Sequence, residues 1–141
     1  MTPAEVGLWR RMSAPDRRHA VAVARRVEAA LGPATSRPVL AAALLHDVGK
    51  IASGFGPARR AAATAAGMAG GYDAARRWRR REGVVGQVGR YLCHDEIGAE
   101  LLVDAGSDAL TIAWAREHHL RPERWTVAAE VGAALKAADD D

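Results

Sequence analysis

Apolar residues recur at steps of three or four along most of the chain, and this spacing predicts amphipathic α-helices. The clearest case begins at Ser13, where a capping hydroxyl is followed by a proline and an acidic residue, and it continues to Leu31. A Gly-Pro pair then predicts the end of the helix. Within it His19, Val23 and Val27 share one face, so we expect His19 to point toward the core.

The same reasoning predicts helices along the rest of the chain. A second helix is expected from about Ser36 to Gly49, with His46 and Asp47 in its last turn. The region 57–82 is rich in Ala, Gly and Arg and is expected to form two helices separated at Gly70-Gly71. Further helices are expected over residues 84–92, 94–103, 107–119 and from about 126 to 139.

Strands are not expected. Ala, Leu and Val supply most of the apolar residues, and alternating runs of β-branched and aromatic residues are missing. At 141 residues the chain is long enough to bury the core of one domain. The sequence therefore predicts a single all-α domain over residues 1–141, a compact bundle of about six or seven helices.

Charge and cysteine content exclude several classes of protein. The formal net charge is +3, and the region from Phe55 to Leu92 holds eight arginines against two acidic residues. One cysteine, Cys93, excludes an internal disulfide and favours a reducing compartment. The longest strongly apolar run, Val39 to Leu45, is far shorter than a membrane span, and the N-terminus has no signal-peptide core. We therefore expect a soluble cytoplasmic protein without a transmembrane segment.

All five histidines belong to one spaced series that also contains aspartates. The series consists of His19, His46, Asp47, His94, His118, His119 and Asp139. Each member falls on an inward face or at an end of a predicted helix, as a metal pocket between helices requires. Imidazole and carboxylate groups together are common ligands of zinc, manganese and iron. The series predicts a metal-dependent enzyme.

The residues around these positions resemble a known family. The stretch AALLHDVGKI, residues 42–51, is similar to the signature of the HD superfamily of metal-dependent phosphohydrolases. HDEIGAE, residues 94–100, resembles the downstream H-P-E-I-G-A-E element of that superfamily, with Asp95 in place of the usual Pro. His118-His119 and the closing KAAD, residues 136–139, resemble two later elements. The resemblance covers residues 19–139 and indicates a small stand-alone HD or HDIG-type domain, because no Gly-Tyr-Pro element follows the paired histidines.

The resemblance implies two neighbouring divalent metal ions as cofactors. The first would be held by His19, His46, Asp47 and Asp139, and the second by Asp47, His94, His118 and His119. A carboxylate has two oxygens and can bridge two cations, whereas a neutral imidazole binds one. Mn, Fe, Zn and Mg are all compatible with such a site.

The activity that the resemblance implies is hydrolysis of a phosphate ester or phosphoanhydride by a metal-activated water. The expected partner is a small phosphorylated substrate, and a nucleotide or nucleotide-like compound is the leading candidate. Asp47 is the expected bridging ligand at the reaction centre, and Lys50 is expected to neutralise a phosphate oxygen. A lysine at a helix end, favoured there by the helix dipole, is the alternative interpretation of Lys50.

Two other function classes stay open. A di-iron oxygenase of the HD fold resembles the same ligand set but uses oxygen as a reactant. A non-catalytic metal-binding or ligand-binding regulatory module is the other alternative. Because no recognised nucleic-acid-binding fold appears, no nucleic acid partner is expected, and the sequence does not predict the oligomeric state.

Several assignments within the site also stay open. Asp140 directly follows Asp139 and is the alternative last ligand. His118 and His119 point about 100° apart on a helix, so one of them can orient the other ligands instead of binding metal. Glu117 is either a carboxylate that supports His118 or an exposed helix residue. Cys93 is expected to be a bystander beside His94.

The aromatic and basic residues outside the series have several interpretations. Trp114 and Trp125 are expected in the core. The Arg-rich segment 76–81 is a solvated helix, a patch that attracts anionic substrates, or a contact for lipid or nucleic acid helped by Trp78. Arg59 and Arg60 are candidates for contact with a substrate phosphate.

Overall fold

The computed structural model describes residues 1–55 and 71–140. Its α-helices are α1 (Pro3–Arg11), α2 (Ala14–Leu31), α3 (Arg37–Leu45), α5 (Gly83–Leu92), α6 (His94–Asp104), α7 (Ala109–Glu117) and α8 (Ala129–Asp140). Residues 71–78 are also helical. Short 3-10 helices follow some of these helices: η1 (Gly32–Ala34), η2 (Val48–Ala52) and η3 (Pro122–Arg124). No strand occurs in the described residues, which confirms the all-α prediction.

The helix starts follow from local capping chemistry. The side chain of Ser13 accepts a hydrogen bond from the Asp16 backbone N–H at 3.3 Å, and α2 ends at Gly32, whose φ is 52°. Both ends of this helix were predicted. Helix α1 was not predicted, although Thr2 and Glu5 form a capping box at its start.

Three helix boundaries differ from the sequence prediction. Helix α3 ends at Leu45, and the chain then turns through His46 and Asp47 into η2. Helix α7 ends at Glu117, two residues before the predicted end. Helix α8 begins at Ala129 and not near Thr126, because Thr126 is held outside the helix by hydrogen bonds to Glu117.

The predicted helices between residues 57 and 82 are only partly described. The second of them is confirmed as the helical residues 71–78, while the first lies outside the described residues, as do Arg59 and Arg60. The helices predicted over 84–92 and 94–103 are confirmed as α5 and α6.

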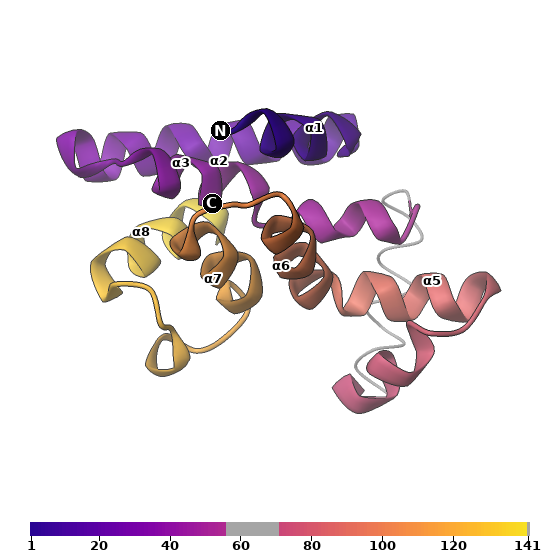
Figure 1. The fold of residues 1–141 in the computed structure, drawn as a ribbon. Helices are drawn as coiled ribbons and strands as arrows, with labels where there is room; N and C mark the ends of the chain where they lie inside the picture. Colours follow the sequence, from indigo (N-terminus) through magenta and orange to yellow (C-terminus); the bar gives the residue numbers. More distant parts are fainter. Residues whose placement is uncertain (56–70, 141) are drawn as a thin grey trace.

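The helices pack in two groups around a shared interior. Helices α1, α2 and α3 lie along one side, and α6, α7 and α8 lie against them, while α5 and residues 71–78 lie at the end of the molecule beyond α6 (Figure 1). One buried cluster joins α2, α3, α7 and α8 and includes Val27, Trp114 and Leu135. A second joins α1, η2 and α6 to α2, α3 and α7 and includes Leu8, Leu45 and Leu102.

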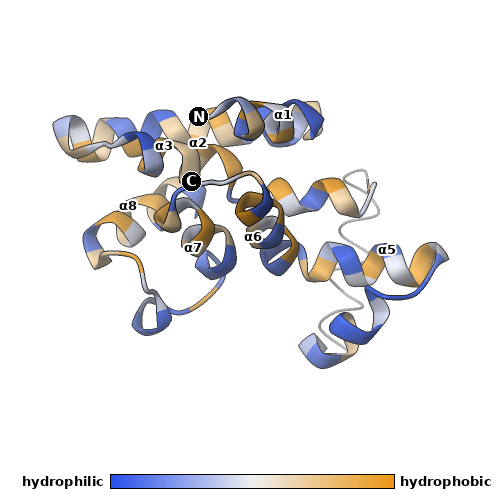
Figure 2. Ribbon diagram, in the orientation of Figure 1, coloured by the Kyte–Doolittle hydropathy of each residue, from blue (hydrophilic) through white to orange (hydrophobic). Residues whose placement is uncertain are grey.

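Hydropathy follows this arrangement. Figure 2 shows hydrophobic residues concentrated on α3 and on the interior sides of the other helices, whereas the turn that leads into α5 is strongly hydrophilic. Helix α3 is buried at Val39, Ala42 and Leu45, all exposed by 2% or less. The turn after this buried helix therefore places His46 and Asp47 inside the molecule, at 2% and 5% exposure.

Candidate metal centre

The seven side chains of the histidine and aspartate series converge on one site from five parts of the fold. His19 comes from α2, His46 and Asp47 from the turn after α3, His94 from the start of α6, His118 and His119 from the turn after α7, and Asp139 from the last turn of α8. Neighbouring histidine rings form a chain with centroid separations between 4.0 and 5.7 Å. The structure thus brings together side chains that are up to 120 residues apart in the sequence.

The tautomers of three histidines follow from their backbone contacts. In His46, His94 and His118 the Nδ1 atom lies 2.8 to 3.0 Å from the carbonyl oxygen three residues earlier in the chain. A carbonyl oxygen only accepts, so each Nδ1 must donate its proton there. In the neutral ring the lone pair then belongs to Nε2, and such contacts are the usual way in which proteins orient a metal-binding histidine.

Two of these Nε2 atoms are buried without a hydrogen-bond partner among the described residues. They belong to His46 and His118, whose side chains are 2% and 0% exposed. An unsatisfied buried polar atom costs about 1–3 kcal/mol, so it calls for an explanation. A cation bound at each of the two Nε2 atoms would satisfy them.

The two carboxylate oxygens of Asp47 face different histidines. Oδ1 lies 3.4 Å from His94 Nε2 and 3.8 Å from His118 Nε2, whereas Oδ2 lies 3.5 Å from His46 Nε2. Lone pairs on nitrogen and on a carboxylate oxygen repel each other unless a cation or a proton lies between them. Asp47 therefore stands between two sets of nitrogen donors.

Asp139 completes the side of the site formed by α2 and α3. Its Oδ1 accepts a hydrogen bond from His19 Nε2 at 2.8 Å and lies 3.2 Å from His46 Nε2. Asp140 points elsewhere and forms an ion pair with Lys136. Of the two aspartates that the sequence left open, Asp139 is the one beside the histidines.

The expectation that His19 points into the core needs correction. Its side chain is 41% exposed, so it lies at the rim of the site and not in the hydrophobic interior. Position 19 shares a helix face with Val23 and Val27, but it is nearer the start of α2, beyond the edge of the buried cluster that contains the two valines. His119 is likewise exposed, and its Nε2 lies 3.2 Å from His94 Nε2.

The donor set fits a divalent metal. Two groups of three ligand atoms lie within 4.8 Å of one another, and each group could hold an ion: His19, His46 and Asp47 in one, and His94, His118 and His119 in the other. Imidazole nitrogen and carboxylate oxygen suit zinc, manganese and iron. Cys93 belongs to neither group, and burial raises its pKa to about 11, which keeps it a neutral thiol.

The electrostatics of the site favour a positive charge near Asp47. Burial raises the pKa of this carboxyl group, but the contact with His94 and the charges of His46 and Lys50 outweigh burial, and the pKa is well below 3.8. Burial lowers the pKa of His46, but Asp139 and Asp47 outweigh it and raise the pKa above 6.5. A site that favours a second proton on His46 also favours a metal cation there.

Lys50 contacts the site directly. Its ammonium group forms an ion pair with Asp47 Oδ2, and its side chain is 18% exposed. The lysine therefore lies beside the histidines and is paired with a carboxylate of the site. It lies in η2, next to the carboxylate on which the two groups of ligands meet.

Packing against α6 explains why a glycine, Gly49, stands in the HDVGK stretch. A Cβ atom on Gly49 would come within 1.9 Å of the His94 carbonyl oxygen and 2.6 Å of the Gly98 backbone nitrogen. The backbones of η2 and α6 therefore touch here, which brings Asp47 and His94 together. The sequence analysis gave no role to Gly49. The close contact was indicated by a glycine in each of the two elements that meet, Gly49 in HDVGK and Gly98 in HDEIGAE.

Glu117 supports the chain after the paired histidines. It is 7% exposed and accepts hydrogen bonds from the backbone and the hydroxyl of Thr126, at 2.7 and 2.6 Å. The loop between α7 and α8 is therefore fixed to the end of α7. Trp114 and Trp125 pack edge to face with ring centroids 5.4 Å apart, and Trp114 is buried in the core as expected.

The Arg-rich segment is partly held against α6. Arg76 and Arg79 form ion pairs with Glu96, and Arg79 also reaches Glu100. Trp78 is half-buried. These ion pairs attach residues 71–79 to α6, while the Arg76 side chain stays 55% exposed, as expected of a solvated basic helix.

Comparison with known proteins agrees with this geometry. The family model of the HD domain matches residues 18–140, which is most of the chain and contains all seven side chains of the site. Searches of curated proteins and of solved structures gave no significant match. Among the described helices none is long and apolar enough to cross a membrane. On the match over residues 18–140, the chain belongs to the HD domain family.

Proposed function

We propose that this protein is a metal-dependent phosphohydrolase that cleaves a phosphate ester or phosphoanhydride in a small substrate. Membership of the HD domain family supports a metal-dependent hydrolase in general terms. The finer proposal, with its ligands and substrate, rests on the chemistry of the site described above.

The observation that carries the proposal is the common orientation of His46, His94 and His118. Each ring donates from Nδ1 to a backbone carbonyl, so each directs Nε2 toward Asp47. Packing alone does not require three buried rings to share a tautomer and to direct their lone pairs at one carboxylate. Metal binding does require it, because the metal takes the lone pair.

Two metal ions are proposed, divided at Asp47. On one side, His46 lies beside Oδ2 of Asp47, and Asp139 lies between His46 and His19. On the other side, His94 and His118 lie beside Oδ1. His119 joins the second group through its contact with His94. When bound, divalent ions supply Lewis acidity toward a phosphoryl oxygen and a nucleophilic water at neutral pH.

The protein's own residues prepare the site for an anionic substrate. Lys50 places an ammonium group beside Asp47, where it can pair with a phosphoryl oxygen. The exposed rings of His19 and His119 mark the sides from which solvent and substrate reach the buried histidines. The buried rings of His46 and His118 keep their positions because the backbone holds their Nδ1 atoms.

Substitution of Asp47 tests the proposal. Asp47→Ala removes the carboxylate between the two histidine groups, so metal content and hydrolysis of p-nitrophenyl phosphate should fall together, the latter by at least about a hundredfold. Asp104→Ala, at an exposed aspartate in the last turn of α6, is the matched control and should keep both. Circular dichroism should show unchanged helix content in both variants. An Asp47→Ala variant with wild-type activity would refute the central role of this residue.

A further inference from the structure

A cleft opens beside His119 on the outer side of the candidate metal centre. It has a volume of about 540 Å³, and its walls include Tyr72, Asp95, Arg116 and Arg124. A second hollow of about 500 Å³ shares Arg76, Glu96 and Arg116 with it. Because the two hollows share these lining residues, they adjoin each other, and we call them together the groove; His119 of the metal centre lines the first of them.

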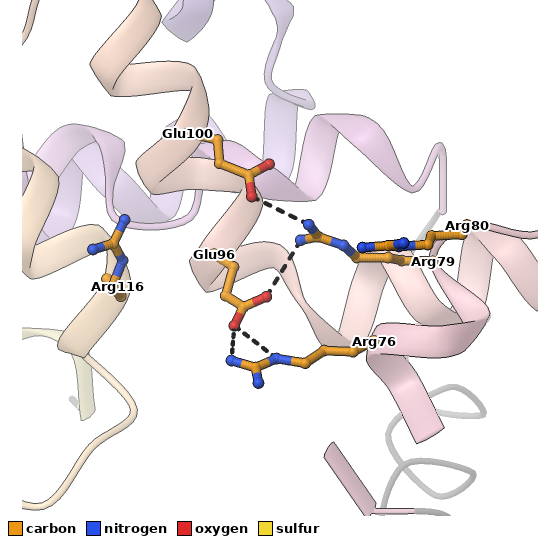
Figure 3. Close-up of a pocket in the computed structure, with 6 residues that line it drawn as sticks. All are labelled: Arg76, Arg79, Arg80, Glu96, Glu100 and Arg116. Carbon is orange, nitrogen blue, oxygen red and sulfur yellow. Dashed lines mark hydrogen bonds and ion pairs between the residues drawn. The ribbon is translucent and has the colours of Figure 1, made fainter. Parts of the chain in front are cut away.

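Arginine dominates the walls of this groove. Five arginines and three carboxylates line it: Arg76, Arg79, Arg80, Arg116, Arg124, Asp95, Glu96 and Glu100. The carboxylates already have partners in the protein. Figure 3 shows Arg76 and Arg79 reaching Glu96, and Arg79 reaching Glu100. Asp95 accepts hydrogen bonds from the Tyr72 hydroxyl at 2.7 and 2.9 Å. The negative charges are therefore engaged, and the surplus charge is positive.

Two of the arginines line the groove together with His119 and have no ion pair among the described residues. Arg116 and Arg124 form no ion pair or hydrogen bond from their side chains with any residue that the structure describes. Arg116 lies three residues before His119, and Figure 3 shows it across the groove from Arg76 and Arg79. Arg124 comes from η3 and lines the same part of the groove as His119. No described residue occupies either guanidinium group, so both can bind an anion.

We infer that Arg116 and Arg124 form a second anion-binding subsite, which takes a further phosphate of a substrate whose scissile phosphate lies at the metal centre. The inference rests on the proposed function and makes it more specific, because it names a substrate with at least two phosphate groups. Guanidinium binds phosphate oxygens with paired, charge-assisted hydrogen bonds. A substrate with a single phosphate and an uncharged remainder would leave both arginines unused.

Phosphate probes test the subsite by calorimetry on the full chain as purified. The wild type should bind tripolyphosphate more tightly than orthophosphate, because only tripolyphosphate can reach both places. Arg116→Gln and Arg124→Gln should each weaken tripolyphosphate binding about fivefold to tenfold, the effect expected from losing one charge-assisted contact. Binding of orthophosphate and metal content should stay at wild-type values in both variants.

Arg121→Gln is the matched control, since Arg121 is exposed, lies on the same loop and does not line the groove. It should change tripolyphosphate affinity less than about twofold, as a surface charge screened by salt does. Equal effects of all three substitutions, or no effect of Arg116→Gln, would overturn the subsite. Failure of the proposed function is a separate result: the wild type would then bind no metal and release no phosphate from p-nitrophenyl phosphate.

Discussion

The two oxygens of Asp47 face different histidines, and the rings around them present Nε2 atoms fixed by backbone carbonyls. The sequence identified which residues belong to this site, because their spacing matches the elements of a family. It did not predict the tautomers. Those depend on the local backbone at the turn or helix start where each histidine lies, which places Nδ1 beside the carbonyl three residues earlier.

At the end of α8, neighbouring aspartates give a sharp test of the ligand set. Asp139→Ala should lower metal content, because this carboxylate lies beside His19 and His46. Asp140→Ala should leave metal content unchanged, because Asp140 pairs with Lys136 at the surface. Elemental analysis of both purified variants measures the difference. If both variants lose metal equally, or if neither does, the assignment of Asp139 is wrong.

The pKa of His46 predicts how metal binding depends on pH. Carboxylates raise this pKa above 6.5, so the proton competes with the metal for Nε2 until the pH exceeds the raised value. Asp47 has its pKa lowered well below 3.8 and stays ionised, and burial lowers the pKa of His118, which stays neutral. The affinity should therefore rise with pH between about 6 and 8, by up to about tenfold per pH unit for each proton displaced. Competition with a chelating dye measures it, and an affinity that is constant over this range would contradict the account.

At the scale of the elements, the sequence predicted helix existence better than helix ends. Ser13 and Gly32 gave both ends of α2, because local capping chemistry is visible in the sequence. The end of α3 at Leu45 was missed, since it depends on the contact of η2 with α6. The start of α8 was missed because a buried side chain, Glu117, holds Thr126 outside the helix.

The contact between η2 and α6 predicts that a substitution of Gly49 lowers both the stability and the metal content of the protein. Gly49→Ala would place a Cβ within 1.9 Å of the His94 carbonyl oxygen, so α6 must shift, at a cost of about 1–3 kcal/mol in the free energy of unfolding. The shift moves His94 relative to Asp47, so metal content should fall as well. Chemical denaturation and elemental analysis measure the two effects.

Gly7→Ala is the control for this change. Nothing lies within 4 Å of a Cβ at Gly7 inside α1, and alanine favours helix, so this variant should be as stable as the wild type or more stable. A Gly49→Ala variant with wild-type stability and metal content would show that the close approach of η2 to α6 does not position the site.

On the scale of the whole molecule, the metal centre lies where two buried clusters meet. One cluster joins α2, α3, α7 and α8, and the other joins α1, η2 and α6 to α2, α3 and α7. Every helix that supplies a ligand takes part in one of them, so packing of the core sets the distances within the site. The all-α fold and the members of the site could be predicted from the sequence. The groove of arginines could not, because it depends on how residues 71–79 pack against α6, opposite Arg116 of α7.

The number of metal ions per chain tests the central claim most directly. Protein purified without chelator and without air, and analysed for elements, should contain about two divalent ions per chain, because Asp47 faces two sets of donors. Manganese, zinc or magnesium would agree with the hydrolase, and iron with a visible absorption band would favour the oxygenase alternative. A chain that retains no metal, and binds none when metal is added in excess, would contradict the account.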